Sequence, residues 1–170
     1  KKGVLGKDPL LSQTAKRYCS AGAPSHRAWR EWSENLPPLM QGYWRALILE
    51  CKSKPFDAIE QLKEIAPRLV QDRKTHAHAI IAHENLARLL RHNSGRKKAS
   101  SVYQRLIELW ASLELTPEKF NLPREEFLLK KIDDHLWAAR YQAFIGEYRK
   151  AQIYTHSALE WIKKTRLRMK

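Results

Sequence analysis

Three histidines lie close together near the middle of the chain, and their spacing decides whether they can hold a metal ion. His76 and His83 are seven residues apart. A helix would place them on one face but two turns apart, which is too far for a single ion. His83 is followed by Glu84, as in the helix of zinc proteases, but Leu86 and Ala87 occupy the positions where a second histidine is needed. We therefore predict no metal site.

The two cysteines, Cys19 and Cys51, form no metal-binding or redox motif. Each lies in an apolar helical stretch, which favours buried free thiols, and a disulfide between them is left open. Neither has a histidine partner in a recognisable catalytic motif, and the six glycines are too scattered to form a nucleotide-binding loop. The sequence thus predicts a protein that is not an enzyme and uses no cofactor.

Basic residues dominate the charge of the chain, with 32 lysines and arginines against 18 acidic residues and a net charge of +14. One cluster contains Arg96, Lys97 and Lys98, close to Arg88 and Arg91, and it predicts an anion-binding surface. A second cluster ends the chain, where cations also complement the dipole of a helix. Nucleic acid, an acidic peptide, a lipid head group or an anionic cell-wall polymer would each suit this charge.

These side chains need a scaffold, and the composition predicts an all-α one. Hydrophobic residues make up 43% of the 170-residue chain, which includes six tryptophans and six tyrosines, so a real core is expected. Runs of β-branched residues are scarce, and no apolar run approaches the length of a membrane span. The chain begins Lys1-Lys2-Gly3, so we expect a fragment or a processed product, and the compartment is left unassigned.

Apolar residues at steps of three and four predict about seven or eight helices. Residues 1–38 are interpreted as a lead-in with one helix pair, and residues 39–170 as a helical array in the same folded unit. The three expected pairs of the array are residues 39–70, 75–113 and 124–168.

Proline and glycine mark the expected helix ends. Pro67 is expected to disturb or end its helix. Gly95 follows one helix and Gly146 another, as helix-ending glycines do. Two prolines predict a loop over residues 115–123 with at most one helical turn.

Each pair carries two alanines at a constant interval of 12 residues. These alanines are Ala46 and Ala58, Ala87 and Ala99, and Ala139 and Ala151. In the last pair Gly146 ends the first helix and Tyr148 is expected to plug the end of the pair. Ala151 and Ala158 share one face, where small side chains let another helix come close. A constant interval of this kind indicates a repeat.

The pattern resembles the tetratricopeptide repeat over about residues 39–168. Successive pairs are offset by 41 and 52 residues, against about 34 in that family, and the family's early tryptophan and late proline are absent. The resemblance implies antiparallel helix pairs stacked as a right-handed superhelix. It also implies a non-catalytic scaffold or adaptor that binds a protein or peptide along its concave face. A generic array of antiparallel helices is the structural alternative.

In such repeats the first helix of each pair lines the concave groove. The resemblance therefore assigns to the groove Tyr43, Trp44, Glu50, Asn85, Arg88, Arg91, His92, Trp137, Arg140 and Phe144. This mixture of arginines and aromatic residues would suit a peptide with acidic and apolar side chains. Burial in the core is the alternative for Trp44, Trp137 and Phe144. Only Asn85 matches the family's clamp for a C-terminal carboxylate, so that ligand is not expected.

Two alternatives to a peptide-binding scaffold remain open. The net charge of +14 favours a helical module that binds nucleic acid or another polyanion. The tripeptide at residues 39–41 resembles a short piece of the catalytic signature of lytic transglycosylases, whose catalytic domain follows a helical superhelix. The chain could then be the noncatalytic region of a larger cell-wall enzyme. Pro38 replaces the preceding glycine of that signature, and Glu34 is followed by Asn35 rather than serine, so no catalysis is expected here.

Overall fold

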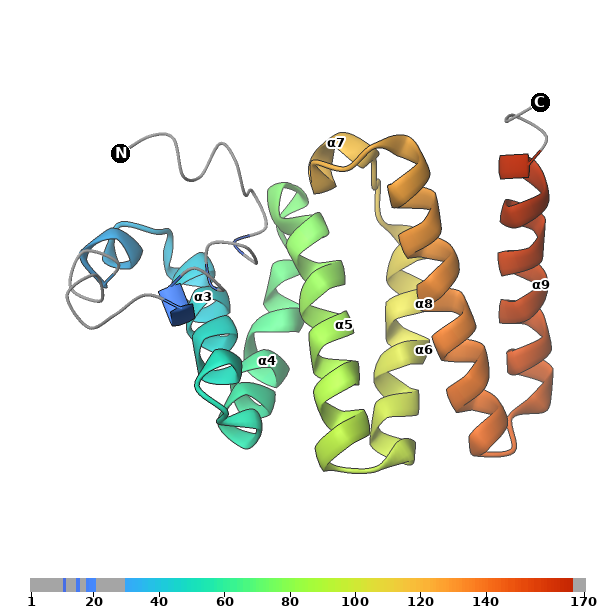
Figure 1. The fold of residues 1–170 in the computed structure, drawn as a ribbon, viewed down its shortest axis with the longest axis horizontal. Coiled ribbons are helices and arrows are strands. Elements are labelled where there is room, and N and C mark those ends of the chain that lie inside the picture. The colour runs from blue at the N-terminus through green and yellow to red at the C-terminus, as the bar shows by residue number, and fades with distance from the viewer. Residues whose placement is uncertain (1–10, 12–14, 16–17, 21–29, 167–170) are drawn as a thin grey trace. The chain divides into compact units, whose positions relative to one another are not determined.

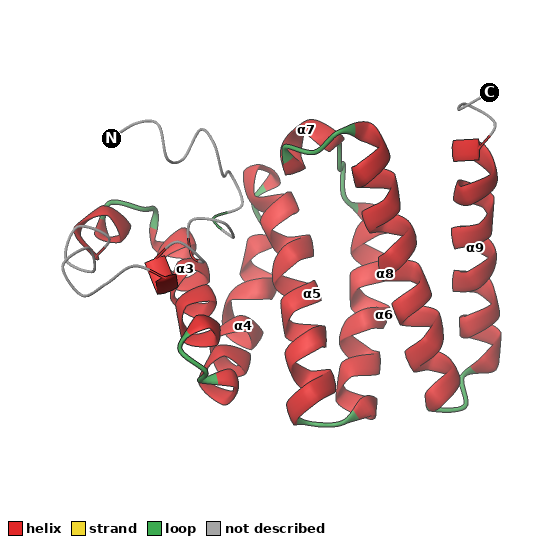
Figure 2. Cartoon of the chain, viewed as in Figure 1, coloured by secondary structure: helices red, strands yellow, loops and turns green. Residues whose placement is uncertain are grey.

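The computed structural model describes residues 11, 15, 18–20 and 30–166, and every regular element among them is a helix (Figures 1 and 2). The all-α prediction is therefore confirmed. None of the helices in this part of the chain combines the length and apolar character that a membrane crossing requires. Much of the helix pair expected within residues 1–38 falls outside the described residues, although residues 30–34 are helical.

The helices follow one another with short connections. Their bounds are α3 Pro38–Cys51, α4 Pro55–Leu69, the 3₁₀ helix η1 Arg73–Thr75, α5 His76–Asn93, α6 Arg96–Ser112, α7 Pro117–Phe120, α8 Arg124–Phe144 and α9 Tyr148–Arg166. These bounds agree closely with the expected pairs, and α7 supplies the single helical turn expected in the loop. The chain forms two compact units, Lys1–Ala82 and His83–Lys170, and the division falls within α5.

Proline and glycine set most of the helix ends. Pro38, Pro55 and Pro117 each occupy the first turn of a helix, where a missing N–H costs no hydrogen bond. Gly95 and Gly146 adopt positive φ angles of 96° and 85°, which lets the chain turn sharply after α5 and α8. The predicted roles of both glycines are confirmed.

The end of α4 corrects one prediction. Pro67 lies inside the helix, which continues to Leu69 rather than ending at the proline. The last turn is held by burial, since Ile65, Ala66 and Leu69 are at most 3% exposed. Thr75 then donates a hydrogen bond from its hydroxyl to the carbonyl oxygen of Leu69 at 2.7 Å, which closes the turn after the helix.

In the first unit, α3 packs on α4. Tyr43 is fully buried, and its ring meets the edge of the His78 ring at a centroid distance of 5.7 Å. Trp44 is also buried, and its ring meets Trp32 at 5.1 Å and Tyr18 at 5.7 Å in edge contacts. Both aromatic residues therefore belong to the core of this unit.

In the second unit, α8 packs against α6 on one side and α9 on another. Ala151 and Ala158, at 9% and 0% exposure, lie in the α8–α9 contact as expected. Tyr148 does not plug this pair, because its side chain is 67% exposed at the start of α9. A cluster of three rings, Trp110, Phe120 and Phe127, joins α6, α7 and α8 with centroid distances of 5.4 to 5.6 Å.

Replacement of Gly42 by alanine tests the close approach of α3 to α4. A Cβ at Gly42 would lie 2.5 Å from Cδ1 of Ile65, whose side chain is buried. We expect this overlap to cost about 1–3 kcal/mol, whereas alanine inside a helix otherwise gains about 1 kcal/mol over glycine. In urea unfolding, Gly42→Ala should therefore destabilise the wild-type chain and stabilise the Ile65→Ala variant. Equal effects in the two backgrounds would contradict the contact.

The cysteines yield a second prediction. Cys51 is exposed and Cys19 half-buried, and both are free thiols; the expected burial is wrong for Cys51, which ends α3. Burial, assisted by a hydrogen bond with Cys51, raises the pKa of the Cys19 thiol to about 12. The thiolate is the reactive form of cysteine. Iodoacetamide at pH 8 should therefore label Cys19, which remains in the Cys51→Ser variant, at least about tenfold more slowly than Cys51, which remains in the Cys19→Ser variant. Equal labelling rates for the two variants would contradict this burial.

Candidate functional site

A hollow of about 200 Å³ opens in the second unit between α5, α6 and α8. It is lined by Glu84, Asn85, Arg88, Arg91, Tyr103, Lys130, Asp133, Asp134 and Trp137. A smaller hollow of about 170 Å³ shares Asp133 and Trp137 with the first and adds Leu136 and Arg140. The structure thus brings together five of the residues that the sequence assigned to a groove: Asn85, Arg88, Arg91, Trp137 and Arg140.

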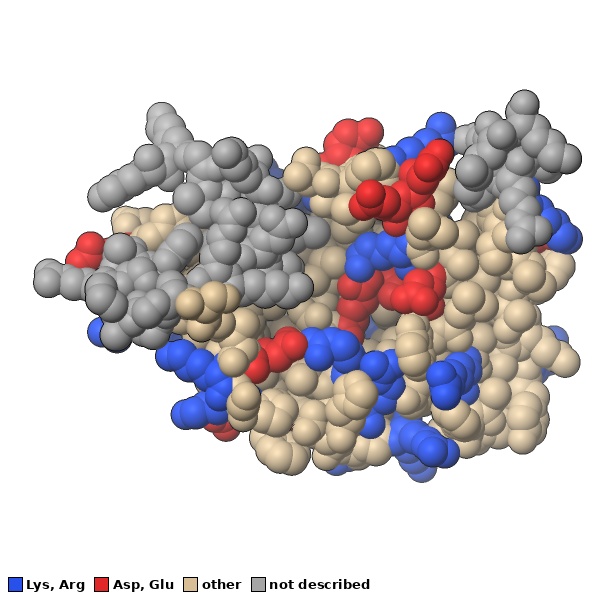
Figure 3. Space-filling view, in the orientation of Figure 1, with Lys and Arg blue, Asp and Glu red and all other residues tan. Residues whose placement is uncertain are grey.

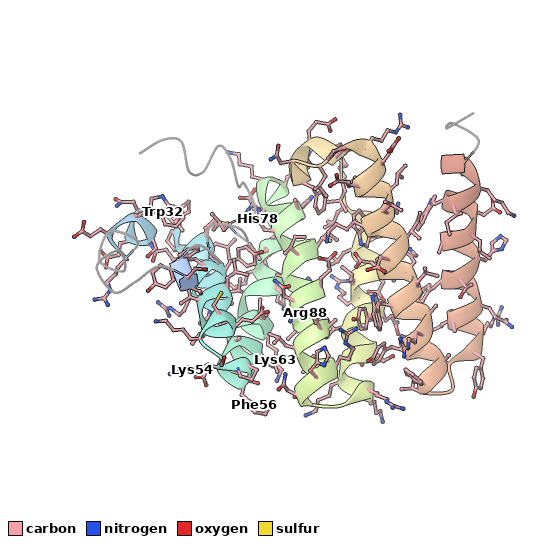
Figure 4. The ribbon with its side chains drawn as sticks, in the orientation of Figure 1. Trp32, Lys54, Phe56, Lys63, His78 and Arg88 are labelled. Carbon is pink, nitrogen blue, oxygen red and sulfur yellow. The ribbon has the colours of Figure 1, made fainter. Side chains whose placement is uncertain are left out.

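Helical spacing explains why these side chains converge. On α5 the lining residues Glu84, Arg88 and Arg91 follow one another at steps of four and three. On α8 the residues Asp133, Trp137 and Arg140 do the same. Arg88 projects from the middle of α5 (Figure 4). One strip of each helix is therefore available to a ligand, and the two strips border the same hollow.

Arginine side chains and aromatic rings alternate along this surface. The guanidinium carbon of Arg91 lies 4.2 Å from the ring centroid of Trp137, and that of Arg140 lies 5.2 Å from the same centroid. Phe144 follows, with Arg140 at 5.5 Å and Arg96 at 4.5 Å from its centroid. We call these five residues the arginine–aromatic row. Contacts at these distances are cation–π interactions, in which each guanidinium is attracted to the face of a ring.

None of the three arginines in the row is paired with a carboxylate in the described part of the chain. Arg91 has an Nη2 atom 3.1 Å from Nε2 of His92, and its buried Nε has no hydrogen-bond partner in the protein. A guanidinium carries five N–H donors, and a ring beneath it uses none of them. The row therefore presents donors that an oxyanion could accept from in a forked geometry.

The floor of the larger hollow contains carboxyl groups, and two of them have partners. Lys130 Nζ lies 2.5 Å and 2.6 Å from the two carboxylate oxygens of Glu84. Trp110 donates a hydrogen bond from Nε1 to Oδ2 of Asp134 at 2.6 Å. Burial, the nearby charge of Glu84 and a hydrogen bond with Glu84 raise the pKa of Asp134 well above its usual value. We infer that Asp134 is held in its neutral form, while Glu84 and Lys130 form an ion pair.

Asp133 differs from its neighbour, because it is exposed and has no ion-pair partner among the described residues. Figure 3 shows acidic and basic side chains next to each other on this face, between α5 and α8. The surface thus has an unpaired carboxylate at one side and unpaired guanidinium groups at the other. Tyr103 is a buried residue that borders the hollow, and burial raises its pKa to about 12, so it stays neutral.

Several predicted site residues lie elsewhere. Tyr43 and Trp44 belong to the core of the first unit and are 0% and 6% exposed, so they do not offer the contact surface that was predicted for them. Burial was the alternative for Trp44, whereas Phe144 is 45% exposed and belongs to the row. Glu50 is half-buried on α3 in the first unit, and His92 is exposed beside Arg91.

The predicted anion-binding residues form the first turn of α6. Arg96, Lys97 and Lys98 are all exposed there, and no acidic residue accompanies them. Cations are unfavourable at this end of a helix, because the N–H groups already carry partial positive charge. Of the three, Arg96 contributes to the arginine–aromatic row. The position of these cations is therefore not explained by the stability of α6.

The sequence analysis missed the acidic half of the site, which consists of Glu84, Asp133 and Asp134 with Lys130 as the partner of Glu84. A signal was present on α8, where Lys130, Asp133 and Asp134 precede Trp137 at helical steps and so share its side of the helix. Among the described residues there is no group of three or more histidine, cysteine, aspartate or glutamate side chains that could hold a metal ion.

The sequence was compared with protein families, curated proteins and solved structures. No protein-family model matches the sequence, and neither the curated proteins nor the solved structures contain a match to it.

The buried carboxyl group of Asp134 yields a test of the floor of the hollow. Its raised folded-state pKa means that the neutral form is favoured by folding. The corresponding stability is present at pH values below the ordinary pKa of aspartate and is lost as the pH rises toward the folded-state pKa. Asp134→Asn keeps an acceptor for Trp110 and carries no charge. We expect this variant to be more stable than wild type at pH 8, with the difference disappearing near pH 4.

Asp133→Asn is the matched control, because it removes the same group from the exposed neighbouring position. Thermal unfolding across pH 4–8 should show no comparable gain for this variant. Asp134→Ala should instead destabilise the chain by about 1–3 kcal/mol at all these pH values, because the buried Trp110 N–H loses its acceptor. A stability difference between Asp134→Asn and wild type that does not change with pH would contradict the buried neutral carboxyl.

Proposed function

We propose that this protein is a non-catalytic scaffold that binds a protein or peptide through the arginine–aromatic row of its second unit. The observation that carries the proposal is the set of three guanidinium groups, of Arg91, Arg96 and Arg140, stacked on Trp137 and Phe144 without carboxylate partners among the described residues. Arg96 and Arg140 are exposed, and the rings beside these arginines leave their N–H donors free for a ligand.

The physical basis is preorganisation. A ring beneath a guanidinium restricts its motion before any ligand arrives, so less entropy is lost when the ligand binds. Hydrogen bonds from guanidinium to carboxylate are among the stronger ones in proteins, at about 1.5–3 kcal/mol. Trp137 and Phe144 add apolar area at the centre of the surface, where aromatic and arginine residues contribute most to binding.

We further propose that the helix pairs stack as a right-handed superhelix of the tetratricopeptide type, with α3, α5 and α8 as the first helices. The supporting observation is the alanine interval. All six alanines at 12-residue spacing are buried, at 0–9% exposure: Ala46, Ala58, Ala87, Ala99, Ala139 and Ala151. Small buried residues at equivalent positions in successive pairs are what close helix packing in such repeats requires.

A second candidate function is the binding of a polyanion such as nucleic acid. The observation in its favour is the turn of Arg96, Lys97 and Lys98, which places three cations where a helix dipole disfavours them. A bound phosphate would relieve this repulsion. The net charge of +14 acts in the same direction by attracting any polyanion at low ionic strength.

The double variant Arg91→Gln with Arg140→Gln tests the scaffold proposal. Peptides that bind the wild-type chain would be selected from a displayed random library and their affinities measured by fluorescence anisotropy. The double variant should bind them at least about tenfold more weakly, because charged hydrogen bonds are lost. The matched control is Arg68→Gln with Arg149→Gln, which removes the same charge from exposed positions on α4 and α9 and should leave affinity nearly unchanged.

Equal losses in the two double variants would reject the site, because attraction by net charge alone would then explain binding. The polyanion alternative is measured separately with a single-stranded DNA oligonucleotide and with heparin. Binding to either should fall steeply as salt increases if phosphate or sulfate contacts dominate. Absence of binding to both at low salt would remove this alternative.

A further inference from the structure

The row of arginines does not stand alone, because Asp133 lies on the same strip of α8 as Arg140. Asp133 and Arg140 both line the smaller hollow, together with Leu136 and Trp137. Asp133 is exposed and unpaired in the described part of the chain, and so is Arg140 apart from its ring contacts. The strip therefore presents a carboxylate, an apolar centre and a guanidinium in succession.

The spacing of these groups limits what can contact all of them. Asp133 and Arg140 are seven residues apart on α8, which is roughly 10 Å along a helix and about the length of three residues of extended chain. Leu136 lies between them and is 41% exposed. A ligand that lies along the strip would meet all three features within one short segment.

From this arrangement we propose, building on the function proposed above, that the ligand segment carries a basic residue and an acidic residue two or four positions apart with an apolar residue between them, so that both charged side chains of an extended segment face α8. The basic side chain would bind Asp133, the apolar one would contact Leu136 and Trp137, and the acidic one would accept hydrogen bonds from Arg140 and Arg91. Each half of the ligand meets charge of the opposite sign, which sets its direction on the surface.

The same carboxylate opposes a uniform polyanion. A phosphate backbone that followed the row from Arg96 to Arg140 would next meet the unpaired carboxylate of Asp133. Like charges placed opposite one another are costly at an interface, and they suppress the wrong partner more than they strengthen the right one. The acidic half of the site thus favours a mixed-charge peptide over nucleic acid.

Three synthetic probes test this inference on the full chain by fluorescence anisotropy. The first peptide has lysine, leucine and glutamate in the proposed arrangement, and the second has glutamate in place of the lysine. The third probe is a single-stranded DNA oligonucleotide. We expect the mixed-charge peptide to bind about tenfold more tightly than the acidic one, because the acidic one replaces an attraction to Asp133 with a repulsion.

Two matched variants identify the residue responsible. Asp133→Asn should weaken binding of the mixed-charge peptide by about fivefold at low salt, as expected for one exposed charge pair, and should strengthen binding of the acidic peptide. Asp57→Asn makes the same change at an exposed position on α4 and should alter neither affinity. Circular dichroism would confirm that both variants remain folded.

The outcomes separate the two proposals. If the acidic peptide binds as tightly as the mixed-charge peptide, or if Asp133→Asn does not change their ratio, the charge arrangement is rejected while peptide binding stands. If the oligonucleotide binds more tightly than both peptides, the ligand class is wrong. If neither peptide nor any library peptide binds, the scaffold proposal itself is overturned.

Discussion

The position of α8 between two other helices is the constraint on which the second unit depends. Because α6 and α9 each cover one side of this helix, only a narrow strip of it faces solvent. Burial of Ala138 and Ala139 allows close packing, and the hydrogen bond from Trp110 to Asp134 resists rotation of α8 about its own axis. Every functional side chain of α8 must therefore come from the strip that remains, and its order along the surface follows from the order in the sequence.

The buried carboxyl group of Asp134 shows how the unit tolerates polar groups in its interior. A charged aspartate there would lose hydration without gaining a cation of its own, since Lys130 is already paired with Glu84. Keeping Asp134 neutral avoids this cost and leaves it able both to accept from Trp110 and to bond with Glu84. The floor of the hollow is thus nearly neutral. The charges of Asp133 and the arginines therefore determine the electrostatic potential at the surface of the hollow.

The presence of α-helices and the positions of most helix ends were predictable from the sequence, because both depend on local chemistry. Proline at the start of α3 and α4 and glycine after α5 and α8 act within one or two residues of their own position. Pro67 was mispredicted, since the burial of residues around it depends on helices that a local pattern does not specify. The prediction that Tyr148 plugs the end of its helix pair was wrong for a similar reason, because a turn sequence does not reveal whether another helix covers the aromatic side chain.

The candidate site was predictable only in part, and the reason is again one of distance along the chain. The resemblance to the tetratricopeptide repeat assigned Arg88, Arg91, Trp137 and Arg140 to the first helices, which the helical spacing of apolar residues had outlined. The same spacing gave no means to separate the buried Trp44 from the half-buried Trp137, because burial depends on neighbours far away in sequence. The neutral state of Asp134 depends on Trp110 and Glu84, which come from two other helices, so no local motif contained it.

The choice of arginine rather than lysine in the row supports recognition over simple attraction. An ammonium group stacked on Trp137 would be a point charge with a strongly held water shell, and it would serve solubility equally well. A guanidinium keeps its edge free while its face rests on the ring, so it can bind two oxygens of one carboxylate in a defined plane. The guanidinium carbon of Arg140 lies 5.2 Å from the centroid of Trp137 and 5.5 Å from that of Phe144, so two rings attract it. In the proposed function, a carboxylate of a peptide that contacts Asp133 and Leu136 would supply the oxyanion that this row binds.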